Sequence, residues 1–226
     1  MFFYRLCHIL SYLPLHICYP TKVIGKKNVP KKGASIMCCN HRSNMDAVVI
    51  DTNYYRRPYV LAKHTLFEKK FVGAVLKSYG GIPVNREQVG AHSIKMALDA
   101  LKKGERLLLF PEGTRKDISD EENLSLKNGS AMFAIKSQAP VVPMWLIKKP
   151  KAFQKNVLLV GEPFVLSEFA GQKLSKEILE QASQIISQKM QKLRDDYIKE
   201  QEEKEAKKKN KKSKNKSKNG VEKKED

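Results

Sequence analysis

ASIMCCNHRSNMD, residues 34–46, is the stretch that decides how this chain folds. Its first six residues form a short apolar run, which predicts a buried strand. His41 follows this strand and precedes Asp46 by five positions. On one continuous helix, five positions turn about 500°, so the two side chains would point about 140° apart. We therefore expect His41 on a strand-to-helix turn and Asp46 at the start of the helix, where the two side chains can meet.

The pairing of His41 with Asp46 has a chemical and a structural interpretation. A carboxylate that accepts from one ring N–H fixes the imidazole tautomer and leaves the other nitrogen free to act as a base. The structural alternative is a helix cap beside a packed histidine. The two residues are therefore candidate catalytic residues that need support from elsewhere in the chain.

Composition indicates a globular protein with a basic surface. The length of 226 residues suits one domain plus its ends, and 41% of the residues are hydrophobic. The net charge is +19, and residues 199–226, with 12 Lys and 7 acidic residues, carry only a small part of it. A basic body suits nucleic acid, an anionic membrane surface, or a phosphorylated or acidic substrate.

Four cysteines lie in the first 39 residues, at positions 7, 18, 38 and 39, without the CxxC spacing of zinc sites. They predict reduced, buried thiols, and we expect no metal site. Adjacent residues of a strand point to opposite faces, so Cys38 and Cys39 should lie on the two sides of a sheet.

The first 20 residues are aromatic and aliphatic, but Arg5, His8 and His16 interrupt them, and we expect Pro14 to break any helix. The segment falls short of the roughly 20 mostly apolar residues of a spanning helix and lacks the features of a secretory signal. Two interpretations remain: a first helix packed on the core, or an interfacial segment in one membrane leaflet.

The rest of the chain alternates short apolar strands with amphipathic helices, which predicts an α/β fold around one sheet. Pro143, inside an apolar run, indicates an edge strand or a bulge. After Gln201 the lysine-rich, low-complexity sequence predicts disorder. Strands are expected within 21–32, 34–39, 59–62, 106–110, 141–147 and 156–160, and helices over 47–55, 66–79, 93–103, 129–138 and 176–198.

Polar groups follow two further apolar segments. GGIPVNR ends in Arg86, whose planar fork suits a phosphate or carboxylate, although a surface ion pair is the alternative. FPEGTR offers Glu112, Gly113, Thr114 and Arg115 directly after a buried strand, where α/β proteins place ligands. Glu112 could accept from a substrate hydroxyl or simply pair with Arg115.

These segments, in this order and spacing, resemble the glycerolipid acyltransferase family and most closely its bacterial 1-acyl-sn-glycerol-3-phosphate acyltransferases. NHRSNMD matches the H-x4-D block, GGIPVNR the arginine block and FPEGTR the Glu-Gly block. Looser matches are VPM at 142–144 and KNG at 127–129, and the agreement runs from about residue 23 to residue 164. The resemblance implies a mixed β-sheet surrounded by helices, monotopic membrane association and acyl transfer from a thioester.

From this resemblance we expect three parts. Residues 1–20 form a short interfacial segment, residues 21–198 the acyltransferase domain, and residues 199–226 a disordered Lys-rich tail. Family members usually carry a longer N-terminal helical anchor, and the tail could compensate, since each basic residue near an anionic surface contributes roughly 1 kcal/mol. The expected location is the cytoplasmic face of the cell membrane, with peripheral or monotopic attachment.

The chemistry implied is direct transfer of a fatty acyl group to the sn-2 hydroxyl of lysophosphatidic acid, giving phosphatidic acid for phospholipid synthesis. His41, oriented by Asp46, takes the hydroxyl proton. Arg86 and Arg115 hold the phosphate, and Glu112 orients the glycerol; Gly113 and Thr114 complete this acceptor-binding block. No cofactor is expected beyond the co-substrate, which is either acyl-acyl carrier protein or acyl-coenzyme A.

Two alternatives remain open. The acceptor could instead be glycerol 3-phosphate, a lysophospholipid or a lyso-aminolipid. The charge alone also permits a nucleic-acid-binding protein, but the tail has no aromatic residues to stack on bases and no recognition helix stands out. We therefore expect no specific nucleic acid partner.

Overall fold

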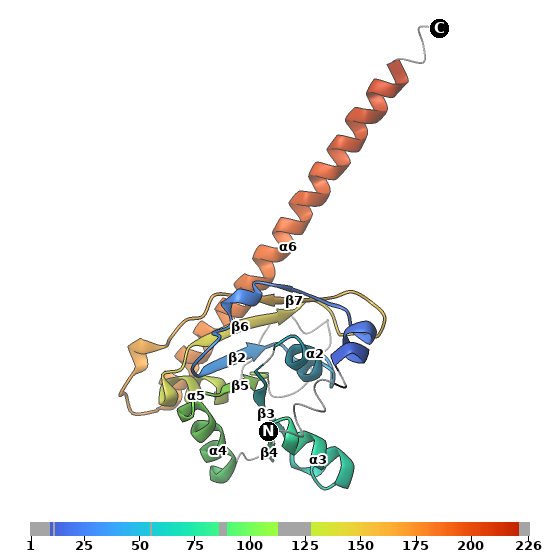
Figure 1. Ribbon diagram of the computed structural model, residues 1–226. Coiled ribbons are helices and arrows are strands. Elements are labelled where there is room, and N and C mark those ends of the chain that lie inside the picture. The colour runs from blue at the N-terminus through green and yellow to red at the C-terminus, as the bar shows by residue number, and fades with distance from the viewer. Residues whose placement is uncertain (1–9, 11, 55, 86–89, 113–127, 222–226) are drawn as a thin grey trace.

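The computed structural model describes residues 10, 12–54, 56–85, 90–112 and 128–221, with side chains up to residue 208. In this part of the chain, seven strands form one sheet in the order β1-β7-β6-β2-β5-β3-β4 (Figure 1). All neighbours are parallel except β6 and β7. The predicted α/β fold with a mixed sheet is confirmed. The strands are β1 Thr21–Ile24, β2 Ser35–Cys39, β3 Pro58–Lys63, β4 Gly81–Val84, β5 Arg106–Leu109, β6 Val141–Leu146 and β7 Asn156–Val160.

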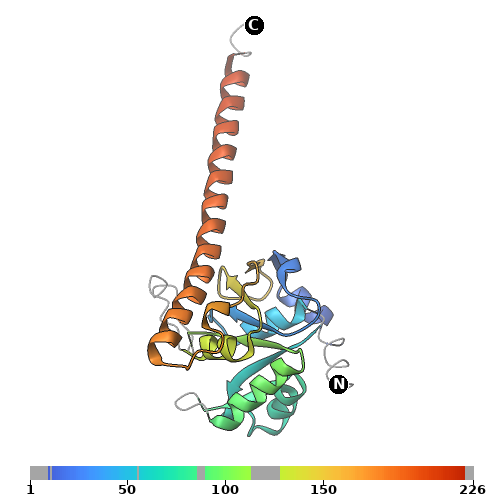
Figure 2. The ribbon, with the colours of Figure 1, turned by 90° about the vertical axis from the view of Figure 1, so that its left-hand side faces the viewer.

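Helices cover both faces of this sheet (Figure 2). Ala97 of α4, Phe133 of α5 and Ile186 of α6 belong to one buried cluster, whereas Val49 and Ile50 of α2 belong to another. The α-helices are α2 Asp46–Thr52, α3 Lys70–Ser78, α4 Ala91–Lys102, α5 Gly129–Ser137 and α6 Lys176–Val221, and 3-10 turns lie at Lys26–Asn28, His64–Leu66 and Ser167–Phe169.

The alternation of side chains along the central strands separates the two cores. Cys38 packs in the cluster under α4, α5 and α6, and Cys39 packs in the cluster under α2, as expected for neighbours on a strand. All five residues of β2 are buried. This burial follows from the position of β2 between β5 and β6, in the middle of the sheet.

Pro143 lies in a central strand, so the expectation of an edge strand is wrong and that of a bulge is right. Strand β6 lies between β2 and β7. Val141 pairs with Phe164 and Met144 with Val160, so the segment opposite β6 contains one extra residue. The Pro143 carbonyl accepts the Gly161 N–H there at 2.8 Å. Because the ladder is interrupted at this bulge, the missing proline N–H is tolerated.

The C-terminal segment differs from our expectation of disorder, because α6 continues through residue 221 and projects away from the body (Figures 1 and 2). No glycine or proline occurs between Gly171 and Gly220. The residues beyond the core are mainly Lys and Glu, which are good helix formers. Pairs such as Glu200 with Lys204, at 2.6 Å, add support along the helix.

Residues 12–18 are also helical, so Pro14 does not break the helix as we expected. Proline fixes φ near the helical value, and its missing amide donor and its ring affect only the turn that precedes it. Beyond it, the Tyr19 N–H donates to the Leu15 carbonyl at 2.7 Å.

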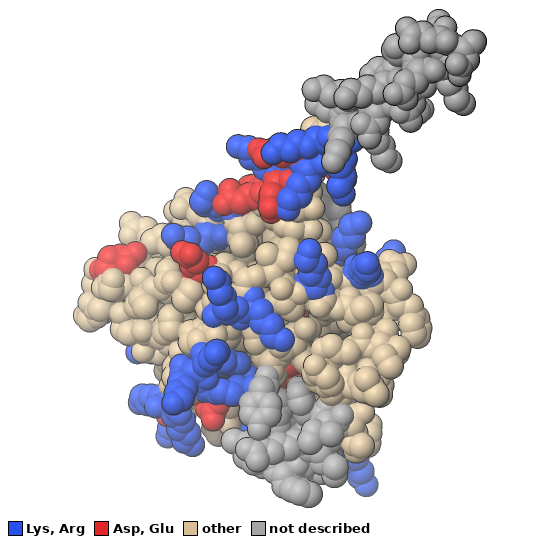
Figure 3. Space-filling model, turned by 45° about the horizontal axis from the view of Figure 1, so that its top comes forward, with Lys and Arg blue, Asp and Glu red and all other residues tan. Residues whose placement is uncertain are grey.

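Among the described residues, no helix has the length and apolarity needed to cross a membrane. On the face presented in Figure 3, Lys and Arg side chains outnumber acidic ones.

Candidate active site

His41 and Asp46 meet at the carboxyl end of β2. Nδ1 of His41 lies 2.8 Å from Oδ2 of Asp46. The histidine lies on the turn after the strand, and the aspartate is the first residue of α2. The contact expected from the five-residue spacing is therefore present. Because an ionised carboxylate only accepts, Nδ1 carries the hydrogen, and Nε2 is left as the basic nitrogen.

The same carboxylate oxygen fixes the turn that carries His41. Oδ2 of Asp46 accepts the backbone N–H of Arg42 at 2.6 Å and that of Ser43 at 2.7 Å. The hydroxyl of Ser43 accepts the Met45 N–H at 3.2 Å, which closes the turn just before α2. Asp46 is fully buried, and His41 is 8% exposed. The dyad is thus preorganised, since both the position and the tautomer of the imidazole are fixed.

Asn40 fastens this turn to the neighbouring strand, a role that we did not predict. Its side-chain oxygen accepts the Leu146 N–H at 2.7 Å, and its amide nitrogen donates to the Leu146 carbonyl at 3.0 Å. Both bonds are buried. The Asn40 side chain thus extends the hydrogen-bond ladder between β2 and β6 by one pair of bonds. This pair fixes the position of the residue before His41. The position of an asparagine directly after a buried strand was the only sequence signal for this contact.

Phe110 stacks on the imidazole of His41, with 4.1 Å between ring centroids and 21° between the ring planes. It follows the last residue of β5, so two adjacent parallel strands supply the two rings. We had treated Phe110 only as the end of an apolar strand. The stack fixes the ring plane of His41, while Asp46 fixes its in-plane rotation.

Glu112 follows the strand that supplies Phe110. It is buried, two residues beyond Phe110. Burial raises the pKa of the Cys39 thiol well above its usual value, and the carboxylates of Asp46 and Glu112 raise it further. The other predicted binding residues, Arg86, Gly113, Thr114 and Arg115, lie outside the described residues, and their roles stay predictions.

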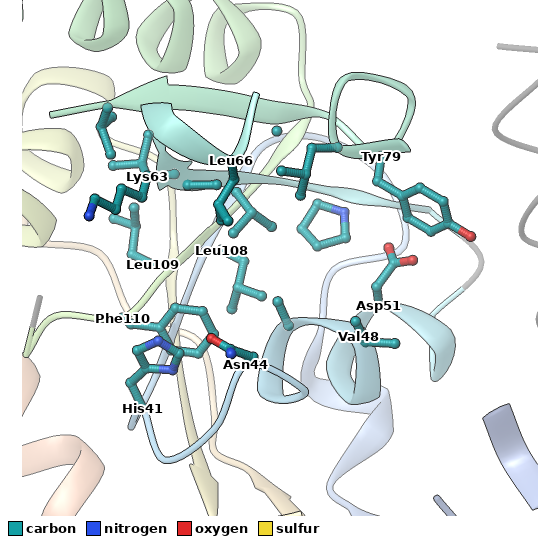
Figure 4. A pocket seen from close by; sticks show the side chains of 18 of the residues that line it. His41, Asn44, Val48, Asp51, Lys63, Leu66, Tyr79, Leu108, Leu109 and Phe110 are labelled. Carbon is teal, nitrogen blue, oxygen red and sulfur yellow. The ribbon is translucent and has the colours of Figure 1, made fainter. Parts of the chain in front are cut away.

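A cavity of about 670 Å³ lies beside His41 (Figure 4). His41, Asn44 and Phe110 lie at one end in this view, and Asp51 and Tyr79 at the other. Most of the lining is apolar and comes from residues 12–18, α2, β3, α3, β5 and α5. Lys63, at the end of β3, and Ser130, in the first turn of α5, are polar lining residues that we did not single out from the sequence. The site therefore combines an oriented base with space for an apolar substrate.

Comparison with known proteins agrees with this class of site. The sequence pattern of the family described as Acyltransferase matches residues 20–147. A 1-acyl-sn-glycerol-3-phosphate acyltransferase from Bacillus subtilis (strain 168) is 31% identical over 198 residues, covering 84% of this chain and 96% of the relative. The enzyme of the same name from Borreliella burgdorferi is 33% identical over 139 residues, covering 60% of this chain and 54% of that protein.

A solved structure shares the fold. The 1-acyl-sn-glycerophosphate (LPA) acyltransferase PlsC from Thermotoga maritima superposes with a TM-score of 0.61 at 25% identity, covering 82% of this chain and 76% of that one. An α/β sheet with a His–Asp pair at a strand end and an apolar cavity beside it is an arrangement suited to acid–base chemistry on an apolar substrate. The chain belongs to the acyltransferase family.

Proposed function

We propose that this chain transfers a fatty acyl group from a thioester to the sn-2 hydroxyl of 1-acyl-sn-glycerol 3-phosphate, giving phosphatidic acid. The observation that carries this proposal is the oriented His41–Asp46 dyad at the edge of the apolar cavity. The names of the relatives, which span organisms as different as Bacillus subtilis and Borreliella burgdorferi, support the choice of acceptor.

The proton path follows from the orientation of the imidazole. Nε2 of His41 takes the proton of the acceptor hydroxyl as its oxygen forms a bond to the thioester carbon. Asp46 stabilises the imidazolium through its 2.8 Å bond to Nδ1. When the tetrahedral intermediate collapses, the C–S bond breaks, and the sulfur takes the proton from His41. A thiol with a pKa of about 8.5 is a good leaving group, so no covalent enzyme intermediate and no metal are needed.

The cavity suits an acyl chain. Val48 of α2, Val75 and Leu76 of α3 and Leu108 of β5 line it from three sides. A lining of this kind stabilises a chain by removing apolar surface from water, at about 25 cal/mol for each Å². With the acyl chain in the apolar part, the thioester carbonyl and the acceptor hydroxyl would lie near His41. An apolar cavity with a few polar groups at the reacting end is usual for small-molecule sites.

The acceptor headgroup would occupy the polar side of the dyad. Glu112, buried two residues beyond Phe110, would orient the glycerol. Arg86 and Arg115 would bind the phosphate, with Gly113 and Thr114 in the same block. The donor would be either acyl-acyl carrier protein or acyl-coenzyme A, and no specific nucleic acid would be bound.

An anionic membrane surface would present the acceptor. Phe71 and Val72 of α3 are exposed, and the same helix face continues to Val75 and Leu76, which line the cavity. Phe71 is 82% exposed. The apolar wall of the cavity thus extends outward to solvent, as a lipid entering from a bilayer would require.

The N-terminal helical segment repeats this pattern on another side of the cavity. Leu15 lines the cavity, whereas Leu13 and Ile17 are exposed. Phe153, 75% exposed, lies beside the segment, because its N–H donates to the Cys18 carbonyl at 2.5 Å. We place these apolar side chains at the headgroup level of the cytoplasmic face, with lysines contacting anionic lipid, as a peripheral or monotopic attachment.

The test is acyl transfer by the purified chain in detergent. Both thioester donors would be offered with lysophosphatidic acid and, separately, with glycerol 3-phosphate, another lysophospholipid and a lyso-aminolipid. Formation of phosphatidic acid at the highest kcat/KM supports the proposal. Preferential acylation of another acceptor would keep the reaction class and reject the substrate.

A further inference from the structure

Helix α5 begins at the cavity that contains His41. Gly129, Ser130 and Phe133 contribute to the same lining as the imidazole. The Met132 N–H donates to the Asn128 carbonyl at 3.0 Å, which is the first turn of the regular helical pattern. The N–H groups of the preceding first-turn residues therefore have no acceptor within the helix, and the positive end of the helix dipole lies there.

The start of α5 is not capped by the side chain at its N-cap. Asn128 occupies that position, but within the described ranges its side chain makes no cap hydrogen bond to α5. Instead its Oδ1 accepts the hydroxyl of Ser183 of α6 at 3.3 Å. The first turn, Gly-Ser-Ala-Met, also contains no acidic residue to offset the dipole. The partial positive charge at this end is thus left for something else to neutralise.

Ser130 gives an independent indication of a ligand. Its side chain is 3% exposed, and its hydroxyl has no hydrogen-bond partner among the residues placed by the structure. A buried unpaired hydroxyl costs roughly 1–3 kcal/mol. Ser137, at the other end of the helix, follows the usual pattern, because its hydroxyl donates to the Phe133 carbonyl at 2.7 Å. The Ser130 hydroxyl is therefore available to a group in the cavity.

We propose that the N-terminus of α5 and the Ser130 hydroxyl together bind the oxyanion of the tetrahedral intermediate. The inference rests on the proposed function and adds a catalytic residue to it. When the acceptor oxygen bonds to the thioester carbon, its proton passes to His41, and the carbonyl electron pair moves onto the carbonyl oxygen. Ser130 donates to that oxygen until collapse re-forms the carbonyl and breaks the C–S bond.

The oxyanion fits this position better than the acceptor phosphate. A phosphate carries up to two charges permanently, and Lys63 is the single cationic side chain among the described residues that line this mostly apolar cavity, so burying a phosphate there would leave its charge incompletely paired. The oxyanion carries one charge, and it exists only while His41 is an imidazolium. Ser130 and His41 line one cavity, so the two transient charges form within the same cavity.

The experiment compares Ser130→Ala with the wild type and with Ser137→Ala, a matched serine on the same helix. Ser130→Ala should lower kcat roughly 10- to 100-fold, somewhat less than the 10²–10³ typical of losing one donor, because the backbone amides remain. KM for lysophosphatidic acid should stay unchanged. Ser137→Ala should keep wild-type kcat. Ser130→Cys, with a weak donor of similar size, should fall between Ser130→Ala and the wild type.

The outcomes separate the two claims. A raised KM for the acceptor with unchanged kcat would assign the site to the phosphate and overturn the oxyanion assignment. Wild-type kcat in a folded Ser130→Ala would overturn it as well, while leaving the proposed function intact. A wild-type chain that transfers no acyl group from any thioester would overturn both. Thermal unfolding of each variant confirms that a kinetic loss does not reflect misfolding.

Discussion

Oδ2 of Asp46 lies 2.8 Å from Nδ1 of His41, and the same oxygen accepts two backbone N–H groups of the connecting turn. One buried atom therefore fixes both the imidazole and the loop that carries it. The orientation of the base and the local fold depend on the same carboxylate.

Asp46→Asn should impair both properties. An asparagine can keep only one acceptor oxygen, and its amide can turn a donor toward His41 and favour the wrong tautomer. We expect kcat to fall by about 10²- to 10⁴-fold, and the free energy of unfolding to fall by about 1–3 kcal/mol. Steady-state kinetics and chemical denaturation measure the two effects. Asp196→Asn, at an exposed position of α6, is the control. Full activity in Asp46→Asn would show that the contact is only structural.

The stacked pair of His41 and Phe110 predicts a smaller kinetic effect. Phe110→Leu removes the aromatic contact, which is worth about 0.5–1.5 kcal/mol, so kcat should fall at most about tenfold. Phe110→Tyr keeps the ring and should restore most of the rate if the hydroxyl is accommodated. KM for the donor should change little in either variant. Equal rates for the leucine variant and the wild type would argue against a positioning role of the stack.

The buried thiols predict a loss of stability at alkaline pH. Burial raises the pKa of Cys38 to about 12, and it also raises that of Cys39. Above the ordinary thiol pKa, the unfolded chain loses protons that the folded chain keeps. Stability is therefore complete below that pKa, and it falls as the pH rises toward the folded-state value. Each thiol contributes up to about 1.4 kcal/mol for each pH unit in this window.

Cys38→Ala tests this dependence. Denaturation from neutral pH to about pH 10.5 should show a shallower decline for the variant than for the wild type, even though its stability at neutral pH is lower. Cys18→Ala, which removes a thiol outside the two cores, is the comparison variant. The same slope in Cys38→Ala and the wild type would mean that the Cys38 thiol titrates alike in both states.

The exposed aromatic side chains predict salt-resistant membrane binding. Phe71→Ser and Phe153→Ser should each weaken binding to anionic vesicles about 10- to 100-fold, since burying one such side chain contributes about 1.5–3 kcal/mol. The loss should persist at high salt, where attraction between charges is screened. Ile198→Ser, on the partly exposed α6, is the control and should bind like the wild type. Co-sedimentation that high salt abolishes would indicate attachment by charge alone.

The local part of the site could be predicted from the sequence. The spacing of His41 and Asp46 excluded a single helix and required a strand-to-helix turn, because the helical period is fixed. The opposite positions of Cys38 and Cys39 followed equally from the strand period. Both arguments concern residues that are neighbours in the chain.

The remaining contacts connect distant residues. Asn40 bonds to Leu146, 106 positions away. Phe110 reaches His41 only because β5 pairs with β2. The helical and strand periods of the sequence do not reveal which strands pair or which distant residues meet. Pro143 shows the same limit, because a bulge made it acceptable in a central strand. Beyond Gln201, the lysine-rich composition indicated disorder. The structure instead continues α6 there, because the segment up to Gly220 contains no glycine or proline to end the helix.

The most direct test of the account is the rate of phosphatidic acid formation by His41→Gln relative to the wild type, with circular dichroism to verify the fold. Glutamine retains a polar side chain but cannot take the hydroxyl proton. We expect kcat/KM to fall by about 10²- to 10⁴-fold in a folded protein, the contribution of a positioned general base. A folded His41→Gln variant that forms phosphatidic acid at the wild-type rate would contradict the central claim that His41 is the base.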